Sequence, residues 1–180
     1  ESEVSPRFLG ALTSLSKLEL RNNQLGGDIP KEFGQLAQLE HLDLAENRFD
    51  GPVPSDLGYL RNLRSLFLEG NSLTGPLPPE LSNLENLVHL DFSRNQITGP
   101  LPVLASATGF THMIGSHNRL SNVNSLNLLP RSIQHLDLSY CQLSGASILE
   151  SLAMSERMAG FANLQHLDLS YNDLQTFSTW

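Results

Sequence analysis

The heptapeptide QHLDLSY occurs twice, at 134–140 and 165–171, within a longer frame that recurs along most of the chain. The frame reads L-x-x-L-x-L-x-x-N-x-L, and its starting residues are separated by 24, 24, 24, 23, 23 and 31 positions. These residues are Leu15, Leu39, Leu63, Leu87, Phe110, Ile133 and Leu164. Such a period is typical of a solenoid, in which each unit packs against its neighbours. We therefore expect one elongated domain of about seven units over residues 1–180.

Each unit contains two apolar residues that alternate with polar ones, as Leu42 and Leu44 do. Alternation with a period of two predicts a short strand with one buried face. One strand per unit, with a return path of roughly 20 residues, predicts a parallel sheet. The fifth unit, with Met113 and Gly115 at the two positions, is the weakest instance.

An asparagine follows the strand in six of the seven units, and Cys141 takes its place in the sixth. An inward-turned amide can both donate to and accept from the backbone where the chain bends away from the strand. The sequence therefore predicts a structural ladder of side chains, in which Cys141 is a buried and inert replacement. The ladder comprises Asn23, Asn47, Asn71, Asn95, Asn118 and Asn172.

A second signature, L-x-G-x-I-P, follows the first four strands, as in LTGPLP. The glycines permit a sharp bend, and the prolines impose an extended path that lacks one donor. These glycines are Gly27, Gly51, Gly75 and Gly99, and the prolines are Pro30, Pro54, Pro78 and Pro102.

Together these motifs resemble the leucine-rich repeat family, and L-x-G-x-[IVL]-P resembles its plant-specific subclass. The resemblance is close over residues 1–102 and looser over 103–180. It implies an α/β fold: a curved, right-handed solenoid with a parallel sheet on the concave face and extended or short helical segments on the convex face. Apolar spacing also predicts a helical insertion near 147–162. Both ends fall within a repeat, so we expect the chain to be part of a longer protein.

Composition narrows the class of partner. The net charge is −8, with 11 basic against 19 acidic residues, which disfavours nucleic acid and anionic membrane surfaces. A single cysteine excludes a disulfide within the chain. There is no apolar run of membrane-spanning length and no N-x-[ST] sequon.

The side chains between the strand leucines are predicted to point outward onto the concave face, where all six histidines fall. A catalytic reading of His135, Asp137 and Ser139 fails, because the histidine and the serine would lie roughly 13 Å apart along one strand. Histidines on four successive strands could share a metal ion, but repeat duplication accounts for them more simply. We therefore expect no enzyme activity, functional metal or cofactor. Stacked imidazoles should titrate as a coupled set between about pH 5 and 8, so we hypothesise that binding depends on pH.

The resemblance implies a non-enzymatic module that binds a protein or peptide on its concave face, as part of an extracellular or cell-surface receptor. The alternatives are an inhibitor of a secreted hydrolase, similar to the polygalacturonase inhibitors, and a cytosolic scaffold. Phe67, with Arg64 and Glu69 in the same unit, breaks the columns and is a candidate anchor. The complete set of predicted ligand-binding residues is Arg64, Phe67, Glu69, His89, Asp91, Arg94, His112, His117, His135, Asp137, Tyr140, His166, Asp168 and Tyr171.

Overall fold

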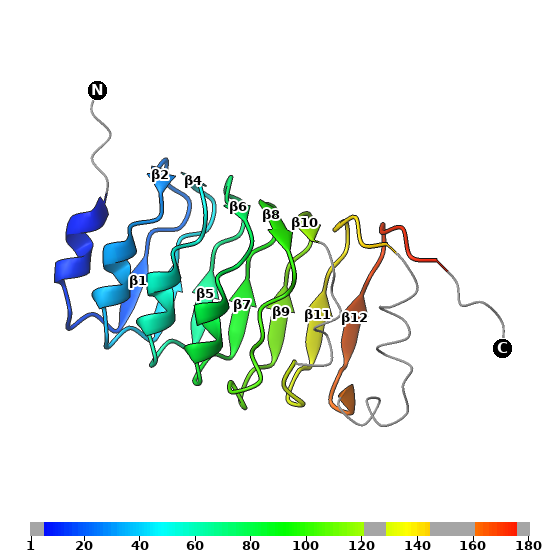
Figure 1. The fold of residues 1–180 in the computed structure, drawn as a ribbon. Helices are drawn as coiled ribbons and strands as arrows, with labels where there is room; N and C mark the ends of the chain where they lie inside the picture. Colours follow the sequence, from blue (N-terminus) through cyan, green and yellow to red (C-terminus); the bar gives the residue numbers. More distant parts are fainter. Residues whose placement is uncertain (1–5, 121–128, 145–160, 176–180) are drawn as a thin grey trace.

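The computed structural model of the protein describes residues 6–120, 129–144 and 161–175. Their main element is a sheet of seven parallel strands stacked in chain order, one strand from each repeat (Figure 1). The strands are β1 (Lys17–Glu19), β3 (His41–Asp43), β5 (Ser65–Phe67), β7 (His89–Asp91), β9 (His112–Ile114), β11 (His135–Asp137) and β12 (His166–Asp168). The predicted leucine-rich repeat solenoid is therefore confirmed, with this sheet on its concave side.

The strands pair in register, so that equivalent positions of successive repeats lie side by side. His135 pairs with His112 on one side and with His166 on the other. Leu42 and Leu66 face inward and are fully buried. Because every repeat buries the same leucine positions, each one covers the apolar side of its neighbour, and a one-residue slip would expose the whole set.

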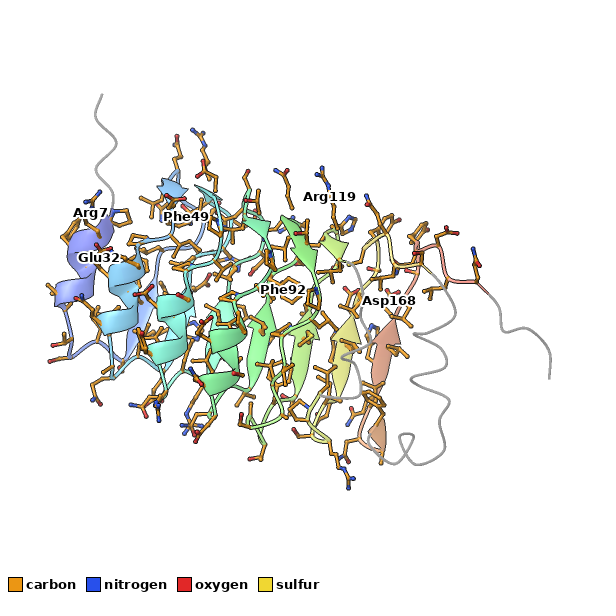
Figure 2. The ribbon with its side chains drawn as sticks, in the orientation of Figure 1. Arg7, Glu32, Phe49, Phe92, Arg119 and Asp168 are labelled. Carbon is orange, nitrogen blue, oxygen red and sulfur yellow. The ribbon has the colours of Figure 1, made fainter. Side chains whose placement is uncertain are left out.

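The fifth repeat departs from the leucine pattern because its small residue makes room for a larger side chain of the fourth repeat. Phe92 occupies a position that is leucine in most other repeats, and a Cβ added at Gly115 would lie 2.4 Å from the Phe92 ring. Gly115 thus leaves the space that the larger ring fills. Phe92 is fully buried near the middle of the stack (Figure 2), and Met113 is buried beside it in β9.

The asparagine ladder forms as predicted. The Asn47 amide donates to the carbonyls of Leu20 and Leu44, and its oxygen accepts from the Leu25 amide. The later asparagines likewise tie the bend of their own repeat to the preceding one, whereas Asn23 bonds within its own repeat. Cys141 is buried in the same column, where its thiol donates to the Gly115 carbonyl at 3.1 Å.

Two smaller sheets along the upper edge in Figure 1 were not predicted. They arise in the L-x-G-x-I-P segments and the equivalent part of the fifth repeat, where the extended backbones of neighbouring repeats come close enough to pair. One sheet pairs β2 (Gly26–Asp28) with β4 (Arg48–Asp50), and the other pairs β6 (Thr74–Gly75), β8 (Gln96–Gly99) and β10 (Arg119–Leu120). Gly51, with a φ of 65°, provides the left-handed bend in one of these segments.

Short 3-10 helices return the chain toward the next strand and bury one apolar residue each, such as Leu57. A Cβ at Gly58 would lie 2.5 Å from the Glu80 carbonyl oxygen, so glycine permits the close approach of successive helices. In the fourth helix the equivalent position is Ser82. No further helix packs there, because the corresponding segment of the next repeat, residues 101–110, is not helical. The helices are η1 (Pro6–Ala11), η2 (Lys31–Gln35), η3 (Ser55–Tyr59) and η4 (Pro79–Asn83).

Two sequence predictions concern the ends of the stack. The predicted insertion near 147–162 lies almost wholly outside the described residues. In the last repeat Leu167 is 42% exposed, because no further described strand covers β12. Within the described ranges, no helix is long and apolar enough to cross a membrane.

Candidate ligand-binding surface

An aromatic row runs along the concave face at the start of the strands. We call this the imidazole row: His41, Phe67, His89, His112, His135 and His166. The His89 and His112 rings stack 5.2 Å apart, and the His135 and His166 rings 4.2 Å apart. The row follows directly from the register of the strands, which places equivalent histidines side by side.

Phe67 completes the imidazole row although it belongs to the neighbouring column. The third repeat has Ser65 where the others have histidine or lysine, and the Phe67 ring fills the resulting gap. Its centroid lies 5.4 Å from that of His41 and 4.7 Å from that of His89. The sequence singled out Phe67 as an isolated anchor, whereas the structure makes it part of a continuous aromatic surface.

A second row follows the strand ends, immediately before the asparagine ladder. The ring of Tyr140 stacks on His117 at 4.3 Å and on Tyr171 at 4.1 Å. We call these three residues the tyrosine row. Tyr140 is 42% exposed and Tyr171 is 72% exposed, so this row is open to solvent.

Every residue at this position of the seven repeats has a positive φ, which the sequence analysis did not anticipate. The left-handed bend turns the next side chain inward, where it joins the ladder of asparagines and Cys141. Gly70 satisfies this requirement without strain, but the other six repeats use residues with side chains. They are Asn22, Glu46, Arg94, His117, Tyr140 and Tyr171, with φ values between 51° and 58°.

Aspartates between the strand leucines have a structural function. One oxygen of Asp91 accepts the amide of Ser93 at 2.9 Å and its hydroxyl at 2.7 Å. Asp137 holds Ser139 in the same way. These bonds close the bend after the strand, so each of these predicted ligand-binding aspartates has one oxygen already engaged.

The same bonds argue against a serine–histidine pair. The Ser139 hydroxyl donates to Asp137 at 2.8 Å, while the His135 ring stacks between two other imidazoles. The arrangement therefore differs from that of an activated nucleophile, in which the base contacts the hydroxyl. Among the described residues, no group of three histidine, cysteine or acidic side chains is placed to hold a metal ion.

Differences in burial give equivalent titratable groups along the face different pKa values. Burial, reinforced by the neighbouring imidazoles, lowers the pKa of His89 to about 4, and it lowers the pKa of His135 in the same way. Burial raises the pKa of Asp91, whereas the hydrogen bonds from Ser170 lower the pKa of half-buried Asp168. The predicted range of pH 5 to 8 for the histidine column is therefore wrong for His89, which titrates below it.

Two ion pairs cross the face by passing over a small residue of the intervening repeat. Arg21 reaches past Ala45 to pair with Glu69. Arg94 pairs with Glu46 on the far side of Gly70. The sequence pattern predicted no role for Arg21 or Glu46, because partners 48 residues apart give no local signal.

Arg64 does not join the group in which the sequence placed it. It pairs with Glu40 at 3.4 Å at an exposed position before the strand, while Glu69 pairs with Arg21. Cys141 is also no part of the face, because it is fully buried and burial raises the pKa of its thiol to about 11.

The comparisons with known proteins agree with this architecture. Family models of leucine-rich repeats match residues 2–49, 62–84, 86–106, 132–153 and 162–176. No curated protein sequence matches the chain significantly.

Solved structures of plant proteins are similar over almost the whole chain. The ectodomain of the Arabidopsis thaliana membrane receptor kinase GASSHO1/SCHENGEN3, in complex with CASPARIAN STRIP INTEGRITY FACTOR 2, is 35% identical with a TM-score of 0.83. The match covers 94% of this chain and 20% of that one. The Arabidopsis receptor kinase HAESA ectodomain, in complex with an IDA peptide hormone ligand, is 30% identical with a TM-score of 0.79, covering 95% and 28%.

A plant ice-binding protein is also similar, at 30% identity and a TM-score of 0.67, over 94% of this chain and 60% of that one. The chain thus spans less than a third of each receptor ectodomain and more than half of the ice-binding protein. Since the family models match most of its length and these structures share its repeat geometry, the chain belongs to the leucine-rich repeat family, in the plant-type subclass.

Proposed function

We propose that this chain is a non-enzymatic recognition module, part of an extracellular or cell-surface receptor, that binds an extended peptide or a protein segment on its concave face. The observation that carries the proposal is the pair of aromatic rows. The serines between them, such as Ser116 and Ser139, are 7% and 6% exposed, whereas the Tyr140 and Tyr171 rings project from the surface. The rows therefore border a recessed polar strip.

The dimensions of this strip suit a single extended chain. Each buried serine follows the histidine of its repeat by four positions, which corresponds to roughly 13 Å of extended chain. The strip offers the free aspartate oxygens to the N–H donors of a peptide backbone. The rows supply tyrosine, a residue type that dominates binding hot spots.

The backbone conformation of the tyrosine row supports a binding role. A left-handed conformation costs a residue with a side chain about 1–2 kcal/mol, and asparagine or glycine tolerates it better. Tyr140 and Tyr171 both carry this cost and leave large rings exposed. The bend is common to all seven repeats, so the support for binding is the choice of two large exposed rings where asparagine would cost less.

The similar structures support the class of ligand and the location. HAESA is described in complex with a peptide hormone, and GASSHO1/SCHENGEN3 is described as a membrane receptor kinase. An ice-binding role, as in the similar plant protein, fits poorly, because the charged and imidazole groups of this face do not form a regular uncharged array. A hydrolase inhibitor or a cytosolic scaffold would use the same face but would require a folded protein as partner.

The test uses a library of random linear dodecapeptides selected against the 180-residue chain. Selected peptides are titrated against wild type, a Tyr140→Ala/Tyr171→Ala variant and a Tyr59→Ala control. Tyr59 is 68% exposed but lies in η3 on the convex side, so it matches Tyr171 in type and exposure.

We expect binding to weaken at least tenfold in the double variant and to stay unchanged in the control. Equal binding by all three proteins, or no enrichment of any peptide, would contradict peptide recognition on this face. Surface biotinylation of intact cells that express the full-length protein tests the location, and labelling only after lysis would argue against a cell-surface receptor.

A further inference from the structure

Three acidic side chains from successive repeats of the concave face share the positive charge of Arg21. We call them the carboxylate cluster: Asp43, Glu69 and Asp91. They come from three successive repeats, with Asp43 in β3, Glu69 just after β5 and Asp91 in β7. Asp43 and Glu69 are only 8% and 7% exposed.

One buried oxygen of this cluster has no hydrogen-bond partner among the described residues. One oxygen of Asp43 accepts the Ala45 amide, and one of Asp91 accepts from Ser93. Glu69 uses one oxygen for Arg21, but its Oε2 is buried and has no hydrogen-bond partner among the described residues. A buried, unpaired carboxylate oxygen is costly, so an N–H donor that gains access to it would be stabilising.

The cluster also has too little positive charge. Arg21 pairs with Glu69, and its guanidinium also lies 3.9 Å from Asp43. One guanidinium therefore faces three carboxyl groups. The nearby Arg94 also acts on Asp91, but it pairs with a further carboxylate, Glu46, so the two arginines face four acidic groups. Burial raises the pKa of both Glu69 and Asp91, as expected where cations do not compensate buried carboxylates.

We propose that the carboxylate cluster binds a basic side chain of the ligand, an arginine or a lysine. This inference rests on the proposed function and adds a positive charge on the ligand to it. The basic group donates to Glu69 in a charge-assisted hydrogen bond.

Arg21 is the internal competitor for this site. Its side chain is 46% exposed and extends across Ala45 from just after the end of β1. A long, half-exposed arginine side chain can turn aside, which uncovers the carboxylate of Glu69 for the incoming group. Neutralising Arg21 should therefore strengthen the binding of a basic ligand, whereas neutralising Glu69 should weaken it.

The test uses two synthetic peptides, acetyl-Tyr-Gly-Arg-Gly-Tyr-amide and its citrulline counterpart. Citrulline has nearly the shape of arginine without the charge. Binding is followed by chemical-shift titration of the isotope-labelled chain. The proteins are wild type, Glu69→Gln, Arg21→Gln, and a Glu40→Gln control in which the exposed pair with Arg64 is removed instead.

We expect wild type and the Glu40→Gln control to prefer the arginine peptide at least fivefold. The preference should disappear in Glu69→Gln and increase in Arg21→Gln, with all variants folded by circular dichroism. Equal affinity for the two peptides, or a preference that persists in Glu69→Gln, would overturn the cation subsite. If library peptides still bind through the tyrosine row in that case, the proposed function stands; if no peptide binds at all, both fail.

Discussion

The rings of Tyr140 and Tyr171 stack 4.1 Å apart with 11° between their planes, and both residues have left-handed backbones. Parallel repeats impose this arrangement, because the same bend recurs at the same position and carries its side chain into the same column. A residue chosen for stability alone would not be tyrosine here. The predictions below separate side chains that serve binding from those that hold the repeats together.

Replacing Tyr171 by asparagine should leave stability almost unchanged while reducing peptide binding. Asparagine tolerates a positive φ, which recovers roughly 1 kcal/mol, and loss of the ring stack removes a similar amount. We expect the free energy of unfolding, measured in urea, to change by less than about 1 kcal/mol. Affinity for library-selected peptides should fall about tenfold, and a loss of stability above 2 kcal/mol with intact binding would show a structural role instead.

Replacing His89 by phenylalanine should make the chain less sensitive to acid. The pKa of His89 is about 4 in the folded chain, against an ordinary value of 6.5. The unfolded chain therefore binds the proton more readily, and the stability due to neutral His89 is lost as pH falls from about 6.5 toward 4. Phenylalanine keeps the aromatic row and removes both the titration and the unpartnered Nε2.

The melting temperatures of wild type and His89→Phe at pH 7 and pH 5 test this. We expect a smaller decrease on acidification in the variant than in wild type. Glu69 and Asp91 act in the opposite direction because their pKa values are raised, but they are common to both proteins and cancel in the difference. Identical pH dependence in the two proteins would show that the folded environment does not disfavour the charged imidazole.

Replacing Gly58 by alanine should destabilise the stack through a single methyl group. The added Cβ would lie 2.5 Å from the Glu80 carbonyl oxygen, and neighbouring backbone cannot yield as a side chain can. We expect a loss of about 1–3 kcal/mol in urea unfolding. The control is Gly109→Ala, where an added Cβ would have no atom within 4 Å apart from its chain neighbours. An equal loss in both variants would show that the close approach of the helices at Gly58 is not the cause.

Replacing Asn47 by alanine should cost more than the same change at Asn23. The buried Asn47 amide satisfies the carbonyls of Leu20 and Leu44 and the amide of Leu25. Each buried group left unpaired costs about 1–3 kcal/mol, so we expect a total of at least 3 kcal/mol. Asn23 is exposed at the first repeat, and its carbonyl partners can turn to water. Equal losses in urea unfolding would mean that the ladder is not a buried network.

The regular part of the candidate surface could be predicted because every repeat contributes one residue to each column. The histidines of the imidazole row and the order of the aspartates follow from the period and the parallel pairing alone. The ion pairs of Arg64 with Glu40 and of Glu69 with Arg21 could not be predicted, because sequence proximity says little about contacts between repeats. Partners of Glu69 lie two repeats away and require coordinates.

By itself the sequence determined the solenoid, its register, its buried leucines and its asparagine ladder. The reason is that in-register stacking of identical units buries the same apolar positions in every repeat. Only the tertiary structure decided how the irregular positions combine. Phe67 fills the space beside Ser65, Arg21 passes over Ala45, and the strand ends adopt left-handed bends. These features depend on the sizes of side chains in neighbouring repeats, and repeat packing brings those side chains together across long stretches of chain.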